Sequence, residues 1–368
     1  MSAGLEGIVV AETRLSRVDG IAGRLIVAGH DVEDLVADWS LPDVAALLWN
    51  EYADTPRRGD QVASDLGRAR LIAADLVPRL LRVSGGATPV EALRTGWSLL
   101  NDNDPKKHGI DNSALLTGAA PVFVAAHWRH SNNTSVIAPD PERGHAADFL
   151  AMLGLNHEAL SARALERYLI TIADHGMNAS TFTARAVAST QAGEISAVVA
   201  ALCALKGPLH GGAPGPVLDM LDEIASESDI TPWIHAALAE GSRLMGFGHR
   251  VYRTRDPRAD VLKEIVRNLK DASDRIAFAE AVENGVLETL AARYPDRRLD
   301  TNVEFYTALA LDGIGLPREL FTPVFAMGRV IGWCAHIKEQ VASGRLIRPA
   351  TSYVGNLPEG AAALQMAG

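Results

Sequence analysis

Apolar residues recur at intervals of three and four along most of this chain, and that spacing predicts α-helices. Leu165, Leu169 and Ile172 form one such stripe. No predicted strand alternates with the helices, and no glycine-rich phosphate loop follows a strand. A parallel α/β fold of the Rossmann type therefore has no support, and the pattern predicts a largely helical protein.

Composition agrees with a helical globular protein. Hydrophobic residues make up 48% of the 368 residues, charged residues 22% and aromatic residues only 5%. Sheets favour aromatic and β-branched residues, so this bias favours packed helices. The length fits two or three domains, or one large domain with a smaller insert.

Caps and breaks divide the helical stretches. A helix is expected after Ser40, and another begins near Ser161 and ends at His175-Gly176. In the last long helix, Gly328 and Gly332 form a face of small residues. Short strands are expected at 8–10 and 25–27. We expect the remaining helices at 87–100, 113–130, 180–205, 216–225, 234–245, 260–269, 275–293 and 321–343.

The charge balance excludes some classes of function. The net charge is −10, from 35 Lys and Arg against 45 Asp and Glu, which argues against binding nucleic acid. Cys203 and Cys334 are predicted to be small buried hydrophobic residues in a reducing compartment. Residues 1–17 have no apolar signal segment, and no apolar run reaches membrane-spanning length. We expect a cytoplasmic protein without a membrane partner.

Two histidines follow breaks in the helical pattern. His210 lies in Lys206-Gly-Pro-Leu-His-Gly-Gly-Ala213, where glycines allow a ligand to approach the main chain. His249 lies in Met245-Gly-Phe-Gly-His-Arg-Val-Tyr252, ahead of several arginines that suit an anion. A plain turn remains the alternative at His210, and a solvated basic loop remains the alternative at His249.

Two further residues carry weaker signals. His175 either orients a polar ligand or caps its helix. Glu304 lies in Asn302-Val-Glu-Phe-Tyr306, where burial would raise the pKa of its carboxyl and make it a proton acceptor. A lone glutamate in such a run is more often a solvated face or a helix start. No metal site is expected, because neither HExxH nor paired-cysteine spacing occurs.

Taken together, these segments resemble the citrate synthase family over nearly the whole chain. The order of the segments matches the family order. The matching segments are 4–7, 18–20, 32–35, 175–183, 207–213, 246–252, 256–258, 302–306, 321–323, 328–329, 348–349 and 353–355.

The resemblance implies an all-α homodimer whose subunits have two domains. Residues 1–210 and 316–368 would form the large helical domain, and residues 211–315 would form the smaller inserted domain. The domains would close over oxaloacetate, which binds first, and an acyl-CoA, which binds second. Both are substrates, and no further cofactor is implied.

The resemblance also implies roles for individual residues. His210 would stabilise the enolate oxygen of the thioester, Glu304 would remove the α-proton, and His249 would protonate the oxaloacetate carbonyl. The remaining residues would bind substrate. They are His175, Arg258, Arg329 and, from the other subunit, Arg348 for oxaloacetate, and Arg253, Gly246, Phe247, Gly248 and Val251 for coenzyme A.

The chain departs from the common family motif at Glu304, where most members have aspartate. The extra methylene moves the carboxylate by roughly one bond length, and a shift of about 1 Å can cost on the order of 100-fold in rate. Some two-domain members share this variant, which favours compensation by the local backbone.

Several functions remain open at this stage. The first expectation is a transferase of the tricarboxylic acid cycle that uses acetyl-CoA. A 2-methylcitrate synthase that uses propionyl-CoA fits the same motifs, since one methylene is worth only about 1–3 kcal/mol of discrimination. A non-catalytic homologue that binds coenzyme A or oxaloacetate is the alternative from another class. A lyase acting in reverse is disfavoured, because no ATP-handling segment is present.

Overall fold

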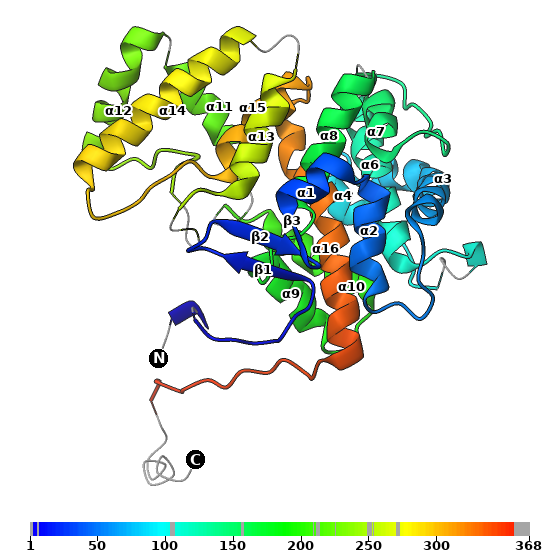
Figure 1. The fold of residues 1–368 in the computed structure, drawn as a ribbon. Helices are drawn as coiled ribbons and strands as arrows, with labels where there is room; N and C mark the ends of the chain where they lie inside the picture. Colours follow the sequence, from blue (N-terminus) through cyan, green and yellow to red (C-terminus); the bar gives the residue numbers. More distant parts are fainter. Residues whose placement is uncertain are drawn as a thin grey trace.

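Helices form most of the protein. The computed structural model describes residues 3–5, 7–103, 107–155, 158–208, 210, 214–224, 226–248, 252, 254–269 and 273–356. Within these ranges the one sheet has three short strands, and helices supply the rest of the regular structure (Figure 1). The predicted all-α class is confirmed.

The chain up to Leu205 contributes the strands and nine of the α-helices in the described ranges. The strands are β1 Ser16–Asp19, β2 Arg24–Val27 and β3 His30–Asp31. The helices are α1 Val32–Asp38, α2 Leu41–Asn50, α3 Gly59–Val83, α4 Pro89–Ser98, α6 Asn112–Ser131, α7 His145–Leu153, α8 Ala159–Ile172, α9 Ala179–Ala188 and α10 Glu194–Leu205.

The rest of the chain continues with helices that alternate with short connections. They are α11 Pro214–Glu223, α12 Ile230–Ala239, α13 Pro257–Arg267, α14 Ser273–Arg293, α15 Val303–Gly313 and α16 Phe321–Ser343. Among the described residues, 3₁₀ turns lie at Ala3–Leu5, Glu227–Asp229 and Arg318–Leu320.

The strands pair antiparallel in the order β1-β2-β3. The prediction at 25–27 is confirmed, since these residues lie in β2. The strand predicted at 8–10 is wrong, because this segment is irregular and Val9 is 84% exposed. Apolar β-branched residues form a strand only where a neighbouring strand pairs with them.

Residues with positive φ values change the bounds of two predicted helices. The helical region at 180–205 divides into α9 and α10, because Gln191 and Gly193 have φ values of 62° and 92°. The helix predicted at 234–245 instead spans Ile230–Ala239, and Gly241 follows its end with φ 77°. The helix predicted at 321–343 is α16.

Helix α16 lies in the core of the larger group of helices, where it packs against α2, α6, α8, α9 and α10 (orange in Figure 1). The segment Arg318–Ser343 is long and apolar enough to cross a membrane, but its most apolar window is 89% buried inside the structure. Its composition is therefore that of a core helix.

Two glycines bring α16 against the end of α8. A side chain at Gly328 would clash with Ile172, and one at Gly332 would collide with the Ala173 carbonyl. The Gly332 N–H donates to that carbonyl at 3.1 Å. The close approach places Arg329 of α16 beside the residues that follow α8, which include Asp174.

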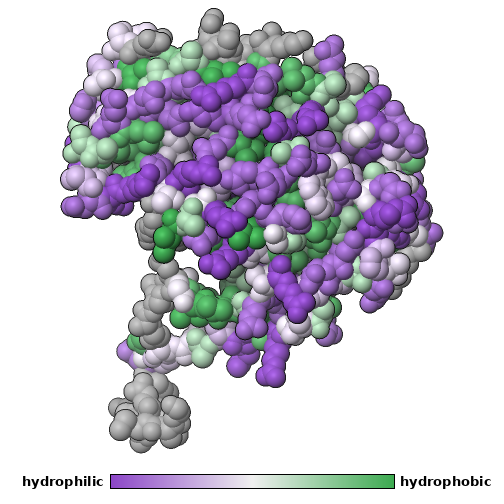
Figure 2. All heavy atoms as spheres, viewed as in Figure 1, coloured by the Kyte–Doolittle hydropathy of each residue, from purple (hydrophilic) through white to green (hydrophobic). Residues whose placement is uncertain are grey.

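A second group of helices lies at the upper left of Figure 1, where α11, α12 and α14 are labelled. Within it α12 packs against α14, and α13 packs against α15. α13 and α15 also contact α8, so they lie between the two groups. The face shown in Figure 2 is mostly hydrophilic, with smaller hydrophobic patches.

The two cysteines have different environments. Cys334 in α16 is fully buried, as predicted, and Cys203 in α10 is exposed, so the second prediction is wrong. α10 buries Leu202 and Leu205 against its neighbours, and position 203 faces away from them. Apolar neighbours in sequence did not identify which face of the helix is covered.

Candidate active site

The connection between α8 and α9 carries the first group of polar side chains. Asn178 caps α9, with its Oδ1 accepting hydrogen bonds from the N–H groups of Ser180 and Thr181, each at 3.1 Å. Gly176 has φ 59°, which lets the chain turn sharply after His175. The turn fixes His175 and Ser180 on either side of one short loop.

His210 meets this loop through its Nε2 atom. The Ser180 N–H donates to Nε2 at 3.2 Å, and the Ser180 Oγ lies 2.8 Å away. Trp333 of α16 donates to the same Oγ at 3.2 Å. A backbone N–H can only donate, so Nε2 is the acceptor and Nδ1 carries the proton of the neutral ring.

Electrostatics favour the neutral form of His210. Burial of the ring and the positive charge of Arg329 lower the pKa of His210 to about 4. The imidazole is therefore uncharged at neutral pH. The neutral ring can donate a hydrogen bond from its Nδ1–H and keep that proton.

Arg258 is buried beside a carboxylate. Its Nε and Nη2 donate to Asp256 at 3.0 and 2.8 Å, and only 3% of its surface is exposed. Burial lowers the pKa of Arg258, but Asp256 reverses that effect, and the pKa is raised overall. The two side-chain bonds to Asp256 involve Nε and Nη2 of Arg258, not Nη1.

Arg329 is also buried, and it has fewer partners. Its Nε donates to the Ile172 carbonyl at 2.6 Å, and its guanidinium lies 4.7 Å from the centre of the Phe325 ring. Its Nη2 has no hydrogen-bond partner among the described residues. Burial and the charge of Arg258 lower the pKa of Arg329 to about 10, against the opposing effect of Asp174. A buried cation with an unpaired donor suits an anionic ligand.

Glu304 lies in the first turn of α15 and is half-buried. Asn302 caps this helix, with its Oδ1 accepting the Glu304 N–H at 2.9 Å. Burial raises the pKa of Glu304, while the charges of Arg258 and Arg243 act in the opposite direction. The carboxylate is thus a stronger base than one in water.

The loop from Gly246 to Gly248 is tied to the segment that precedes α15. The Gly246 carbonyl accepts the Asn302 N–H at 2.9 Å, and the Asn302 side chain donates to the Gly248 carbonyl at 2.9 Å. Gly246 has φ 86°, and a Cβ there would lie 2.8 Å from that of Phe305. Only glycine fits this close approach.

Mutual electrostatic effects join the side chains into one polar region. Arg329 acts on the pKa of His210, and Arg258 acts on those of Arg329 and Glu304. His175 enters from the α8 side, where its Nε2 lies 3.3 Å from the Tyr252 hydroxyl. Two buried cations, one neutral imidazole and one basic carboxylate can hold a dianion and transfer a proton beside it.

The family model of the citrate synthase C-terminal domain matches residues 4–350. The chain belongs to the citrate synthase family. A citrate synthase of Haloferax volcanii is 36% identical, and the alignment covers 96% of both chains. Citrate synthase 2 of Bacillus subtilis is 34% identical, over 96% of this chain and 95% of that one.

Solved structures agree with the sequence comparison. The citrate synthase of Thermotoga maritima has a TM-score of 0.85 at 32% identity, and 97% of each chain is covered. A citrate synthase of Thermoplasma acidophilum, solved with carboxymethyl coenzyme A and oxaloacetate, has a TM-score of 0.86 at 28% identity, again over 97% of each chain. The family predicted from the motifs is confirmed.

The described structure does not test every predicted site residue. His249, Val251 and Arg253 lie outside the described residues. Arg348 is exposed in the extended segment after α16, which leaves the helical body in Figure 1. The positions of His175, His210, Arg258, Arg329 and Glu304 make them the candidate site of this citrate synthase family member, and their roles stay predictions.

Sequence reasoning missed the residues that hold this site. Ser180 and Trp333 position His210, and Asp256 pairs with Arg258. Asp256 precedes Pro257 at the start of a helix, which is a capping signal. That signal indicates a helix boundary, but it does not show that the carboxylate also holds an arginine of the site.

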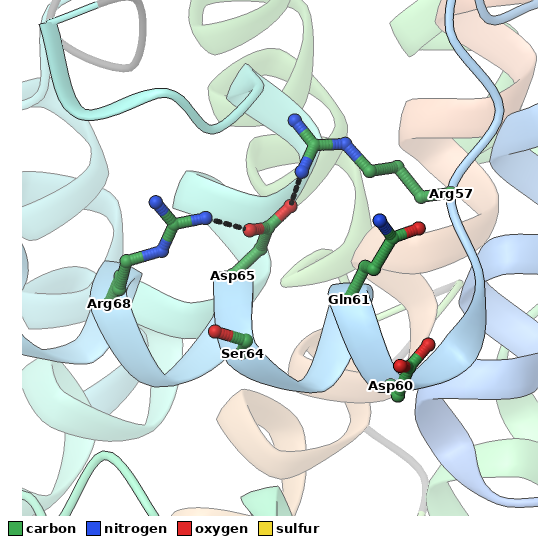
Figure 3. Close-up of a pocket in the computed structure, with 6 residues that line it drawn as sticks. All are labelled: Arg57, Asp60, Gln61, Ser64, Asp65 and Arg68. Atoms are coloured by element: carbon green, nitrogen blue, oxygen red, sulfur yellow. Dashed lines mark hydrogen bonds and ion pairs between the residues drawn. The ribbon is translucent and has the colours of Figure 1, made fainter.

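A separate polar hollow lies on α3, outside the candidate site (Figure 3). It is lined by Arg57, Asp60, Gln61, Ser64, Asp65 and Arg68. Arg57 pairs with Asp65 at 3.1 Å, and Arg68 pairs with the other oxygen of the same carboxylate. The two arginines therefore share the Asp65 carboxylate, while Asp60 pairs with Arg58.

Proposed function

We propose that this protein condenses the acetyl group of acetyl-CoA with oxaloacetate to give citrate and free coenzyme A. This makes it a transferase of the tricarboxylic acid cycle. The observation that carries the proposal is the presence of two buried arginines, Arg258 and Arg329, near Glu304, which can act as a base. The Nη2 of Arg329 has no hydrogen-bond partner among the described residues and fits a carboxylate. Arginine suits a dicarboxylate because its planar guanidinium binds carboxylates at two points.

The chemistry divides between two acid–base groups and a hydrogen-bond donor. Glu304 takes a proton from the methyl carbon of the thioester, while the Nδ1–H of His210 stabilises the enolate oxygen that forms. The enolate carbon attacks the ketone carbon of oxaloacetate, and His249 gives a proton to the new alkoxide. Water then cleaves the thioester and releases the thiol of coenzyme A.

The neutral state of His210 supports its role. A thioester α-proton is weakly acidic, so removal by a carboxylate requires stabilisation of the enolate oxygen as it forms. A neutral imidazole donates a hydrogen bond to that oxygen without giving up its proton. The Ser180 N–H on Nε2 selects this tautomer.

We further propose that residues 1–210 and 316–368 form a large domain that closes against residues 211–315. The separate grouping of α11, α12 and α14 in Figure 1 supports this division. Gly246, Phe247, Gly248, Val251 and Arg253 would contact coenzyme A. Closure would exclude water from the enolate.

A homodimer is part of the proposal, with Arg348 of one subunit completing the oxaloacetate site of the other. The exposure of Arg348 on an extended segment agrees with a role outside its own helical body. Cys203 and Cys334 are both free thiols, as expected in a reducing compartment, and we propose a cytoplasmic location.

Turnover can be tested by thiol release. Purified protein is mixed with oxaloacetate and either acetyl-CoA or propionyl-CoA, and the released coenzyme A thiol is measured. Because Cys203 is exposed and would react with a thiol reagent, a Cys203→Ser variant provides the background control. We expect sustained release with acetyl-CoA. Faster release with propionyl-CoA would assign a 2-methylcitrate synthase, and no release with either would leave only a binding protein.

A further inference from the structure

The carboxylate of Asp256 lies between two helices that carry parts of the candidate site. It precedes α13, which contains Arg258, and it also contacts Val303, the first residue of α15. Only 2% of its surface is exposed. Asp256 was not among the residues predicted from the sequence motifs to act on substrate.

Each oxygen of Asp256 accepts two hydrogen bonds. Oδ1 accepts the N–H of Arg258 at 3.1 Å and its Nε at 3.0 Å. Oδ2 accepts Nη2 of Arg258 at 2.8 Å and the N–H of Val303 at 3.2 Å. These four bonds satisfy a buried carboxylate, so it needs no ligand.

The same four bonds set the relative position of two functional groups. Arg258 is held at its backbone and at its guanidinium, and the Val303 N–H lies one residue before Glu304. A shift of either helix would stretch bonds to one carboxylate. The distance between the Arg258 guanidinium and the Glu304 carboxylate is thus fixed by a third residue, Asp256.

Asp256 also keeps Arg258 from pairing with the base. Arg258 is buried and interacts electrostatically with both Asp256 and Glu304. Without the Asp256 charge, Glu304 would be the remaining carboxylate that acts on this cation. An ion pair between them would lower the pKa of Glu304 and make it a weaker base.

We propose that Asp256 is a positioning residue, whose carboxylate holds Arg258 and the first turn of α15 in one frame and leaves Glu304 free to accept a proton. This inference rests on the proposed function. In this role Asp256 touches no substrate and acts through Arg258 and Glu304.

The first test is the pH profile of kcat/KM in Asp256→Asn. Asparagine keeps the helix cap but removes the charge, so Arg258 acts unopposed on Glu304 and lowers its pKa. We expect kcat/KM to fall by on the order of 100-fold. The acidic limb of the profile should also move to lower pH than in the unsubstituted protein. A limb at the original pH would contradict the proposal, since a merely structural role would not move it.

Asp260→Asn is the matched control. Asp260 lies in the same helix, is exposed and pairs with Arg255 at the surface. It should keep the original rate and pH profile. A change as large as that of Asp256→Asn would show that loss of any carboxylate from α13 is sufficient, and would overturn the assignment.

Asp256→Glu keeps the charge and covers the case in which the asparagine variant does not fold. Its longer side chain cannot keep both Arg258 and the Val303 N–H at their present distances. We expect the acidic limb to stay in place while kcat/KM falls. An unchanged kcat/KM would overturn the positioning role.

The unsubstituted protein separates the two hypotheses. If it shows no turnover with either acyl-CoA, the proposed function fails before Asp256 is tested. If it turns over and the Asp256 variants match it, only the inference about Asp256 fails.

Discussion

Ser180 Oγ lies 2.8 Å from Nε2 of His210, and the Ser180 N–H donates to the same nitrogen at 3.2 Å. These contacts fix the tautomer of a neutral imidazole. They join residues 30 positions apart in the sequence. The proton that His210 can offer to a substrate is therefore on Nδ1.

Ser180→Ala should lower kcat by about two- to tenfold. One hydrogen bond to His210 is worth about 0.5–1.5 kcal/mol, and the remaining N–H of residue 180 still selects the tautomer. Steady-state kinetics with varied oxaloacetate measure the effect, which should leave the KM for oxaloacetate little changed. Thr183→Ala is the control, because its hydroxyl donates to Ala179 O within the same helix. Equal losses in both variants would contradict a specific role for Ser180.

Glu304→Gln should reduce turnover by about 10²–10⁴-fold, the range expected for loss of a general base. Oxaloacetate binding should be nearly intact, because Arg258 and Arg329 remain. Thiol release measures the rate, and isothermal titration measures binding. The exposed Glu319→Gln is the matched control. If Glu304→Gln turns over as fast as the unsubstituted protein, Glu304 is not the general base.

The activity of the unsubstituted protein should fall in acid because of Glu304. Burial raises the pKa of its carboxyl above the ordinary value of 4.5, against Arg258 and Arg243, and the base works only when ionised. kcat/KM should therefore decrease as the pH falls through that raised pKa. His210, with a pKa lowered to about 4, stays neutral over this range. A profile that is level down to pH 4.5 would contradict a buried base.

His145 should make the fold less stable in acid. Burial, with a smaller effect of Arg70, lowers the pKa of His145 from 6.5 to about 3. Between these two pKa values, His145 is therefore protonated in the unfolded chain and neutral in the folded chain. The free energy of unfolding should decrease as the pH falls below about 6.5, by up to about 1.4 kcal/mol per pH unit.

Chemical denaturation at several pH values tests this prediction. His145→Gln should flatten the decrease between the two pKa values. The exposed His130→Gln should retain it. The same slope in all three proteins would assign the acid sensitivity to other groups.

Gly332→Ala should disturb both stability and substrate binding. The new methyl group would collide with the Ala173 carbonyl and lie 2.8 Å from Asp174 Oδ1. Overpacking of this kind costs about 1–3 kcal/mol, and α16 would move Arg329 away from the site. Thermal unfolding and the KM for oxaloacetate measure the two effects. An unchanged KM for oxaloacetate would show that the contact between Gly332 and Ala173 does not affect the site.

Local sequence patterns identified much of the fold. The apolar stripe in α8 and the composition of α16 predicted helices where they occur. The helix α3 was not predicted, although Val62, Leu66 and Ala69 begin a stripe that is buried. Its charged residues lie on both faces, since Asp65 and Arg70 are buried beside that stripe, and they hid the apolar period. The division between α9 and α10 depends on the backbone angles of Gln191 and Gly193, which composition does not reveal.

The candidate site was predictable only in part. Glycines beside His210, and a carboxylate among apolar residues at Glu304, were visible as local patterns. The bond from Trp333 to Ser180 spans 153 positions, and the one from Asp256 to Val303 spans 47. Such contacts follow from the packing of whole helices, so a local pattern cannot contain them.

The most direct test of the central claim is the rate of thiol release from acetyl-CoA in the presence and absence of oxaloacetate. We predict multiple turnovers that require oxaloacetate and that disappear in Glu304→Gln. Citrate should form in equal amount to the released thiol. No release above the background of the exposed Cys203, under conditions where oxaloacetate binds, would contradict it.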